Sequence, residues 1–553
     1  MSDTPLYFLP LGGSGEIGMN MNLYAYGEGR ARQWIMIDCG VMFGDAATPG
    51  VDLICPDPAY ILERKESLLG LVLTHGHEDH IGATAILARD LGCPLYATPF
   101  TAALVQRKLT ERGIDDVPLH VIDVGARFSL GVFDLEYVTL THSIPEPHGV
   151  VIRTPAGVVF HTGDWKIDPD PAHGPLTDAK TLTALGDEGV LAMICDSTNV
   201  FSPGESGSEA AVRDNLVEVI AQQKGRVAVT TFASNLARVL SVCDAARAND
   251  RSVCLLGRSM LRIVDVAQEV GLAPKTLNLV DPKDAGYLPR EHVLYLCTGS
   301  QGEPRAALAR IARDDHPDLT LSDGDTVIFS SKIIPGNERE IYDLQNKLVD
   351  LGVLIITEKD AFVHVSGHPC RDELKRMYGW VRPRFSIPVH GEARHLEEHA
   401  DYALSLGAAD SLAPRNGDLI RIDADGPVVE DEVPAGRLHL DGARLLVADA
   451  EPLRERRRLA ATGAVSVSVV VDDKGRLASD PAVALVGGPR IGADGEDVAA
   501  LVQDAVEDAF DTSPRGRRDD AEGIEILVRQ AVRPLINEAW GKRPAVAVLI
   551  HRV

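Results

Sequence analysis

One short run of histidines and acids constrains this chain more than any other feature. The stretch Leu68–Gly82 reads LLGLVLTHGHEDHIG, so an apolar, strand-forming run ends at Thr74 and a helical pattern begins at Ile81. Three histidines and a carboxylate this close together cannot share one face of a helix or strand. We therefore expect a tight loop at the end of a buried strand. A helix cap needs one polar side chain, whereas imidazoles and carboxylates together suit zinc or manganese, so the run predicts a metal site.

Other strand-like segments also end in residues that bind metals. His142 follows the alternating segment Phe133–Leu140, Asp164 follows Gly157–Phe160, and His390 ends another apolar run. Each alone would suit an ordinary turn, but the repetition favours ligands. The expected set comprises His75, His77 and His142 on one side, Asp79, His80 and His390 on the other, and Asp164 between them.

This set is too large for one tetrahedral ion and suits two ions, each with an open position. Zinc is the expected metal, with manganese or magnesium as alternatives that could support activity. A pair of ions lowers the pKa of a shared water and neutralises negative charge on a phosphoryl oxygen. The sequence therefore predicts hydrolysis as the reaction class.

The N-terminal region contains a misleading glycine motif and a useful acid. Gly13–Gly18 reads GSGEIG, formally a dinucleotide-binding pattern. A helix should follow it, yet Asn22–Tyr26 and Gln33–Asp38 alternate like strands, which predicts a hairpin. Asp38, at the end of the second strand, is expected to accept a hydrogen bond from a ligand imidazole.

Three further histidines have simpler interpretations. His161 lies within a strand and is expected to be a core histidine with a satisfied hydrogen bond. His395 and His399 stand four residues apart on a helix, a spacing that can bind zinc, but no HExxH-type glutamate stands between them. We expect those two side chains on a solvated helix face.

The segment from Ser208 to about Glu358 differs from the rest of the chain. Helix-like and buried strand-like runs alternate there, which is typical of a parallel α/β sheet. Because ligand candidates resume at His390, this segment is predicted to be an inserted domain. The predicted domains are 1–207 and 359–441 for the two parts of the metal-binding domain, 208–358 for the insertion, 442–460 for a linker and 461–553 for a small α+β domain.

Bulk properties limit the partners and the compartment. At 553 residues the chain exceeds one ordinary core. Its net charge of −26 argues mildly against nucleic acid, although bound cations or a local basic groove could supply the attraction. The clusters RERRR at 454–458 and RGRR at 515–518 are more simply interpreted as solvated surface charge than as such a groove.

The N-terminus and the cysteines bear on location. There is no apolar run near 20 residues and no basic leader at the N-terminus, so neither a membrane span nor a secretory signal is expected. The 8 cysteines form no CxxC pair and are expected to be buried free thiols in a reducing compartment. We therefore expect a cytoplasmic protein.

Short motifs along the chain resemble those of one family. They are, in order, GGSGEIGMN, THGHEDHIGA, THSIPE, HTGDWKID, CDSTN, CTGSQGEP, IPGNE, HVSGH and PVHGE. The ligand set is similar to that of the metallo-β-lactamase superfamily, and the insertion with HVSGH resembles the β-CASP nucleic-acid-processing branch. Within that branch the chain resembles ribonuclease J from Leu9 to about Glu392. The C-terminal domain fits the family by position rather than by motif.

The resemblance implies an α/β fold class: a metallo-β-lactamase αββα sandwich, an inserted parallel β-CASP domain and a small C-terminal α+β domain. It implies 5′-to-3′ exonuclease activity that prefers a 5′-monophosphate end, plus endonuclease activity, on single-stranded RNA in RNA processing and decay. It also implies a homodimer or homotetramer formed through the C-terminal domain, possible RNA-decay partners, and no membrane.

The resemblance further assigns roles around the ligands. Asp196 corresponds to an acid behind the metal site that, with Asp38 and Asp79, serves catalysis. His368 would contact the scissile phosphate or protonate the leaving oxygen. The residues expected to cradle phosphate are His364, Ser366, Gly367 and His368. Glu146 stands where the family pattern has aspartate, and Pro369-Cys370-Arg371 replaces a smaller run, which bears on the shape of the phosphate pocket.

Three alternatives remain at this point. A DNA nuclease of the same branch would share the motifs. A small-molecule metallohydrolase such as a thioesterase or lactonase shares HxHxDH but has no need of the insertion. A catalytically silent RNA-binding subunit is disfavoured because every ligand position is filled.

Overall fold

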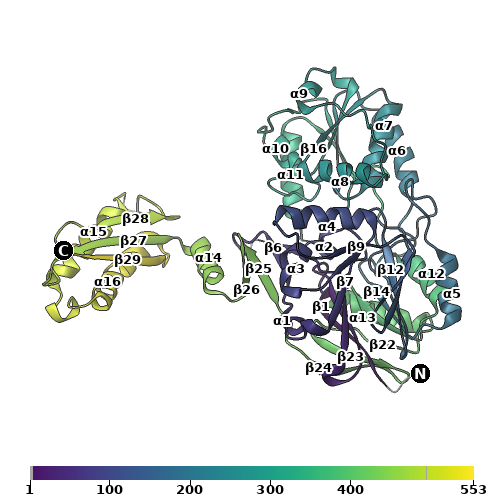
Figure 1. The fold of residues 1–553 in the computed structure, drawn as a ribbon. Helices are drawn as coiled ribbons and strands as arrows, with labels where there is room; N and C mark the ends of the chain where they lie inside the picture. The colour runs from purple at the N-terminus through teal and green to yellow at the C-terminus, as the bar shows by residue number, and fades with distance from the viewer. Residues whose placement is uncertain (1–3, 46, 335, 493–494) are drawn as a thin grey trace. The chain divides into compact units, whose positions relative to one another are not determined.

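The structure, a computed structural model, describes residues 4–45, 47–334, 336–492 and 495–553. Pro335, in the IPGNE motif, lies outside them. The chain divides into two compact units (Figure 1). One contains residues 1–42 and 55–437, and the other contains residues 43–54 and 438–553.

The first unit contains two large mixed sheets. The first sheet has the order β24-β23-β1-β3-β4-β7-β8-β9. Its strands are β1 (Leu6–Gly12), β3 (Met21–Tyr26), β4 (Gln33–Ile37), β7 (Leu68–Val72), β8 (Leu95–Ala97), β9 (Leu119–Val121), β23 (Asp418–Asp423) and β24 (Gly426–Glu432). β3 and β4 pair antiparallel, so the hairpin predicted in place of a dinucleotide fold is present.

The second sheet has the order β10-β11-β12-β13-β14-β20-β22. Its strands are β10 (Arg127–Leu130), β11 (Phe133–Thr139), β12 (His148–Thr154), β13 (Gly157–His161), β14 (Ala192–Asp196), β20 (Phe385–Val389) and β22 (Asp410–Ser411). β13, β14 and β20 are parallel neighbours, which places their carboxyl ends, and the residues after them, at one edge. A short bridge of β2 (Ser14–Gly15) and β21 (Gly391–Glu392) lies beside this edge.

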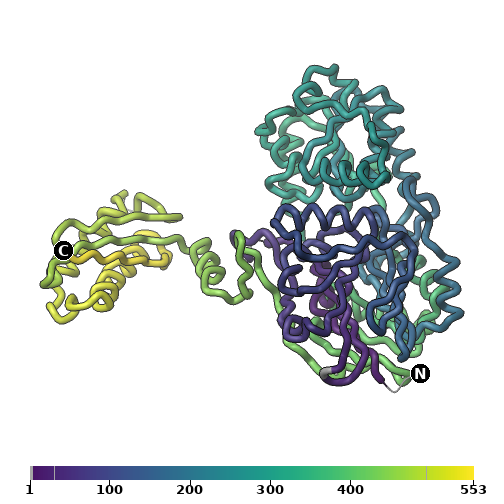
Figure 2. Tube along the Cα trace, viewed as in Figure 1, coloured from purple at the N-terminus to yellow at the C-terminus, as the bar shows by residue number. Residues whose placement is uncertain are grey.

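The core lies between these sheets. Phe8, Tyr24 and Ile37 of the first sheet belong to one buried cluster with Ile152 and Ile387 of the second. Helices complete the sandwich: α1 (Ala59–Leu62), α2 (Glu78–Ile81), α3 (Thr84–Leu91), α4 (Pro99–Glu111), α5 (Ala179–Glu188), α12 (Arg371–Val381) and α13 (Ala393–Ser405). Figure 2 shows the purple N-terminal trace beside green segments near residue 420, where β1 pairs with β23.

The insertion is a parallel α/β domain, as the alternating pattern predicts. Its sheet has the order β16-β17-β15-β18-β19, and every pairing in it is parallel. The strands are β15 (Val227–Thr230), β16 (Ser252–Leu256), β17 (Val293–Cys297), β18 (Thr326–Phe329) and β19 (Leu354–Ile356). The helices are α6 (Glu209–Ala221), α7 (Leu236–Ala248), α8 (Arg258–Glu269), α9 (Pro282–Ala285), α10 (Ala307–Ala312) and α11 (Glu338–Asp350).

The C-terminal domain is α+β, with its own core. β27 (Ala464–Val471) lies between β28 (Ala482–Val486) and β29 (Ala545–Arg552), and α15 (Val498–Thr512) and α16 (Ala521–Trp540) supply the helical side of the core. A small sheet with the order β26-β25-β6-β5 contains β5 (Met42–Phe43), β6 (Leu53–Pro56), β25 (Arg437–Asp441) and β26 (Arg444–Val447). Residues 442–460, predicted as a linker, contain β26 and most of α14 (Glu451–Thr462).

The environment of the cysteines and the composition of the helices can be compared directly with the sequence. All 8 cysteines are buried and free. Burial raises the thiol pKa of each of them, to about 12 for Cys55 and Cys93. Across the described ranges, no helix combines the length and the apolar composition needed to cross a bilayer.

Candidate metal centre

The HGHEDH run follows a buried strand, as predicted, but its second half, Glu78 to His80, lies in the first turn of a helix rather than in a loop. β7 ends at Val72, and α2 begins at Glu78 with His77 at its N-cap. Glu78 and Asp79 occupy the first turn, where carboxylates interact favourably with a helix N-terminus. A methyl group at Gly76 would lie 2.7 Å from Leu104 Cδ1, so a larger residue here would have to displace that side chain.

The first cluster contains His75, His77, His142 and Asp164, whose ligand atoms lie within 4.8 Å of one another. His77 Nδ1 lies 3.1 Å from His75 Nε2 and 3.1 Å from His142 Nε2. Burial lowers the pKa of all three imidazoles, to about 4 for His77, so they are neutral at pH 7. Converging neutral imidazoles with a carboxylate fit a divalent cation.

The second cluster contains Asp79, His80, Asp164 and His390. Asp79 Oδ2 lies 3.1 Å from His390 Nε2, and Asp164 Oδ2 lies 3.2 Å from His80 Nε2. Burial opposes protonation of His80, but Asp164, Asp79 and Asp38 raise its pKa. Asp164 belongs to both clusters, and its Oδ1 is buried without a hydrogen-bond partner. An orphaned buried carboxylate oxygen between imidazoles also fits a bound cation.

Asp38 lies directly behind the second cluster. Its Oδ2 is 2.7 Å from His80 Nδ1, and Thr74 donates to it from its backbone N–H and from its hydroxyl, both at 2.8 Å. Asp38 has a φ of 63°, a left-handed conformation that aspartate tolerates better than most residues. The carboxylate therefore fixes which nitrogen of His80 faces the cluster.

Asp196 and His368 lie beside His390 and Asp164 of the second cluster. Asp196 Oδ2 lies 2.8 Å from His368 Nδ1. Burial lowers the pKa of His368, but Asp196 and Asp164 more than offset this and raise it. Asp164, Asp196, His368 and His390 also form a third group that could hold an ion, a set that sequence reasoning did not anticipate.

The predicted phosphate loop abuts the first cluster. Gly367 O lies 2.5 Å from His142 Nδ1, and Ser366 Oγ accepts a hydrogen bond from Asn199 Nδ2 at 2.7 Å. A methyl group at Gly367 would lie 2.8 Å from His142 Cε1, so glycine permits this approach.

His364, two residues before that loop, has charged neighbours of its own. Burial lowers its pKa to about 3, and its charged neighbours are Arg238, Glu209, Lys332 and Lys166. Its Nδ1 is buried without a hydrogen-bond partner, and the preceding Val363 O accepts hydrogen bonds from Arg238 Nη1 at 3.1 Å and Ser330 Oγ at 2.7 Å, which ties this stretch to the insertion.

Several polar residues of the centre escaped sequence reasoning. Asn20 Nδ2 donates to Asp79 O at 3.1 Å, and Thr198 Oγ1 lies 2.8 Å from His390 Nδ1. Asn199 also donates to His368 O, at 3.0 Å. Asn20 ends the motif GGSGEIGMN, and Thr198 and Asn199 end CDSTN. The motifs therefore contain these residues, but the sequence alone gives them no role.

The predictions for the three remaining histidines have different outcomes. His161 is buried, and its Nδ1 lies 2.8 Å from Tyr24 OH, so it is the satisfied core histidine that was predicted. The prediction of a solvated face for His395 and His399 is wrong, because they are 7% and 0% exposed. His399 lies between Ser197 Oγ, at 2.9 Å, and Tyr378 OH, at 3.1 Å.

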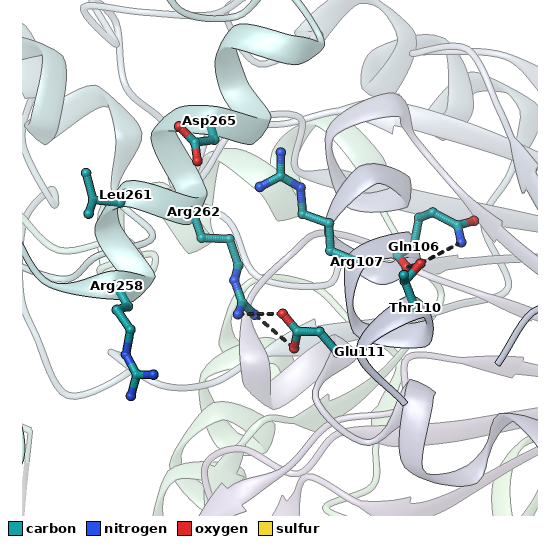
Figure 3. A pocket seen from close by; sticks show the side chains of 8 residues that line it. All are labelled: Gln106, Arg107, Thr110, Glu111, Arg258, Leu261, Arg262 and Asp265. Atoms are coloured by element: carbon teal, nitrogen blue, oxygen red, sulfur yellow. Dashed lines mark hydrogen bonds and ion pairs between the residues drawn. The ribbon is translucent and has the colours of Figure 1, made fainter. Parts of the chain in front are cut away.

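A pocket of about 440 Å³ lies away from the ligands, between α4 and α8 (Figure 3). It is lined by Gln106, Arg107, Thr110, Glu111, Arg258, Leu261, Arg262 and Asp265. Arg262 and Glu111 form an ion pair of 2.6 Å across it. None of its lining residues belongs to the clusters above.

Family models match four segments of the chain. They are described as "Beta-lactamase superfamily domain" at residues 33–187, "Ribonuclease J, beta-CASP domain" at 224–348, "Zn-dependent metallo-hydrolase RNA specificity domain" at 336–414 and "Ribonuclease J C-terminal domain" at 452–553. These matches identify the sandwich, the insertion and the C-terminal domain.

Full-length relatives agree with these matches. The chain is 48% identical to ribonuclease J of Sinorhizobium meliloti, covering 100% of this chain and 98% of the relative. It is 37% identical to ribonuclease J of Corynebacterium glutamicum (97% and 74% covered) and 35% identical to that of Thermus thermophilus (98% and 94%). A crystal structure of an Enterococcus faecalis V583 protein of unknown function shares the fold, with a TM-score of 0.51, 15% identity, and coverage of 76% of this chain and 100% of that one. The chain belongs to the ribonuclease J family of the metallo-β-lactamase superfamily.

Proposed function

We propose that this chain is a two-metal ribonuclease that hydrolyses single-stranded RNA in the cytoplasm, in RNA processing and decay. It would act as a 5′-to-3′ exonuclease that prefers a 5′-monophosphate end, and also as an endonuclease. The observation that carries the proposal is Asp164, a buried carboxylate shared by two adjacent ligand clusters. Family membership supports the metal-dependent hydrolysis of RNA.

The two clusters would hold the ions. His75, His77 and His142 would hold one, Asp79, His80 and His390 the other, and Asp164 would bridge them. Zinc suits these nitrogen and oxygen ligands, and manganese or magnesium are alternatives for activity. When bound, two such ions lower the pKa of water at the site and neutralise charge on the phosphoryl oxygens.

His368 is proposed as the proton donor to the leaving oxygen. Asp196 orients the ring through Nδ1, so Nε2 is free for substrate. The His368 side chain is 23% exposed, whereas that of Asp196 is fully buried. Because Asp196 raises the pKa of His368, the imidazolium persists to higher pH, as a general acid near neutral pH requires.

The turn at Ser366–His368 is proposed to cradle a phosphate. Its hydroxyl and backbone lie within hydrogen-bond distance of Asn199 and of the ligand His142, so a phosphate there would adjoin the metals. Lys332, near His364, would make this region electropositive toward the 5′ end, and His364 itself would contact the substrate as a neutral imidazole, because burial lowers its pKa to about 3. This local field would offset the overall charge of −26.

The C-terminal domain is proposed to form a homodimer or homotetramer and could contact RNA-decay partners. Its separate core supports an independent module. Sedimentation of the full chain with and without residues 461–553 would test this assignment, and an unchanged oligomeric state would contradict it.

The activity is tested on RNA with 5′-monophosphate, 5′-triphosphate and 5′-hydroxyl ends, and on matched DNA, with zinc, manganese or magnesium added. His77→Ala should reduce hydrolysis below detection because it removes a ligand of the first cluster. His551→Ala, at an exposed position of β29, is the control and should retain activity. Undiminished hydrolysis by His77→Ala would contradict the two-metal site, and a preference for DNA would identify a DNA nuclease instead.

A further inference from the structure

An exposed phenylalanine borders the metal centre. Phe201 is 49% exposed and belongs to the loop DSTNVFS, which follows β14. Single exposed apolar residues are common on protein surfaces. The way this residue is held, and the groups around its ring, distinguish it from the others.

The loop that carries Phe201 is tied to catalytic elements. Asn199 Nδ2 donates to Ser366 Oγ at 2.7 Å and to His368 O at 3.0 Å. Ser202 N–H donates to Asn199 O at 2.8 Å, which closes a turn around Val200 and Phe201. Arg371 N–H donates to Ser202 O at 3.0 Å. Phe201 therefore projects from a fixed turn, at most about 7 Å along the chain from Asn199.

The Phe201 ring packs against a histidine and lies near an arginine side chain. His395, 7% exposed, meets the Phe201 ring edge-on, with centroids 5.3 Å apart and planes at 62°. The Arg394 guanidinium lies 5.8 Å from the ring centroid, and its Nε donates to Glu392 Oε2 at 2.9 Å. His395 and Arg394 begin the helix that follows the ligand His390, so the ring and its neighbours border the metal centre.

We propose that Phe201, with Arg394 beside it, is a stacking platform for one unpaired base of the RNA. The base would belong to a nucleotide next to the phosphate held at Ser366–His368. Aromatic rings that stack on bases tolerate any sequence because every base has a π face. A neighbouring guanidinium adds a cation–π contact and can pair with a backbone phosphate. This inference rests on the proposed function and deepens it by placing the substrate on one face of the centre.

The test compares variants at this position for binding and for hydrolysis of 5′-monophosphorylated single-stranded RNA. Phe201→Ala should weaken binding and raise KM by about tenfold or more, as stacking energies predict, with a smaller change in kcat. Phe201→Leu keeps an apolar side chain without the π face and should be similarly weak. Phe201→Trp should keep near-native affinity, and its fluorescence should be quenched when RNA binds.

Tyr287→Ala is the matched control, because Tyr287 is an aromatic residue of the insertion that is 89% exposed. It should leave KM unchanged. If Phe201→Ala or Phe201→Leu bound RNA as the native chain does, or if Phe201→Trp were not quenched, the stacking platform would be overturned. If the native chain hydrolyses RNA and the Phe201 variants behave as it does, this inference alone is refuted. If the native chain does not hydrolyse RNA, the proposed function is refuted.

Discussion

At the scale of single residues, Asp38 shows how backbone conformation supports the metal centre. Its φ of 63° lies in the left-handed region, which directs the carboxylate back toward Thr74 and His80. The three contacts satisfy both carboxylate oxygens. A residue outside the ligand set thereby determines the orientation of a ligand, as carboxylates behind metal-binding histidines usually do.

Asp38→Asn should weaken metal binding by about 10- to 100-fold, because the amide tolerates the left-handed backbone but supplies no charge to His80. The measurement is retained zinc or manganese after dialysis against a graded chelator. Asp115→Asn, at an exposed position, should retain the native metal content. Equal retention by both variants would show that Asp38 does not support the site.

At the scale of elements, two ion pairs that join helices differ in burial. Arg238 of α7 and Glu209 of α6 pair at 2.9 Å, with side chains 0% and 3% exposed. Arg262 of α8 and Glu111 of α4 pair at 2.6 Å across the pocket of Figure 3, with side chains 41% and 54% exposed. Loss of the buried pair should therefore cost more stability than loss of the exposed pair, because an unpaired buried charge is costly and an exposed pair is screened by solvent.

Glu209→Gln should lower the free energy of opening of α6 and α7 by about 3–5 kcal/mol, since it leaves Arg238 buried without its counter-charge. Glu111→Gln should change the opening of α4 and α8 by at most about 1 kcal/mol. Hydrogen exchange followed by mass spectrometry resolves these helices separately. Similar effects of the two substitutions would contradict the argument from burial.

At the scale of the whole molecule, the C-terminal domain has a core of its own. Its buried cluster joins Val465 and Val467 of β27 to Val502 of α15 and Val528 of α16. The members of this cluster lie between residues 465 and 546. Within the described residues, every member of this core therefore comes from the C-terminal domain itself.

A fragment of residues 461–553 should fold by itself, because the domain exceeds the size at which single cores become marginal. Circular dichroism should show one cooperative thermal transition, and nuclear magnetic resonance should show dispersed amide signals. A broad transition with collapsed signals would mean that the rest of the chain is needed.

Much of this protein follows from its sequence, because the informative patterns are local. HGHEDH, the strands that end at His142, Asp164 and His390, and the alternation within 208–358 need only periodicity and side-chain chemistry to interpret. These patterns also imply the insertion, since the last ligand follows it along the chain. The family motifs then narrowed the chemistry to RNA, which the matching relatives support.

Only the tertiary structure decided which side chains face each other. The acidic helix after His390 suggested a solvated pair of histidines, yet packing on Tyr378 and Phe201 buries both. The contacts of Thr198 with His390 and of Asn199 with Ser366 join residues far apart in the chain, and no local pattern encodes them. Residue type and spacing thus determined the chemistry of the centre, whereas burial and orientation, which depend on distant segments, determined how its residues are held and where Phe201 lies.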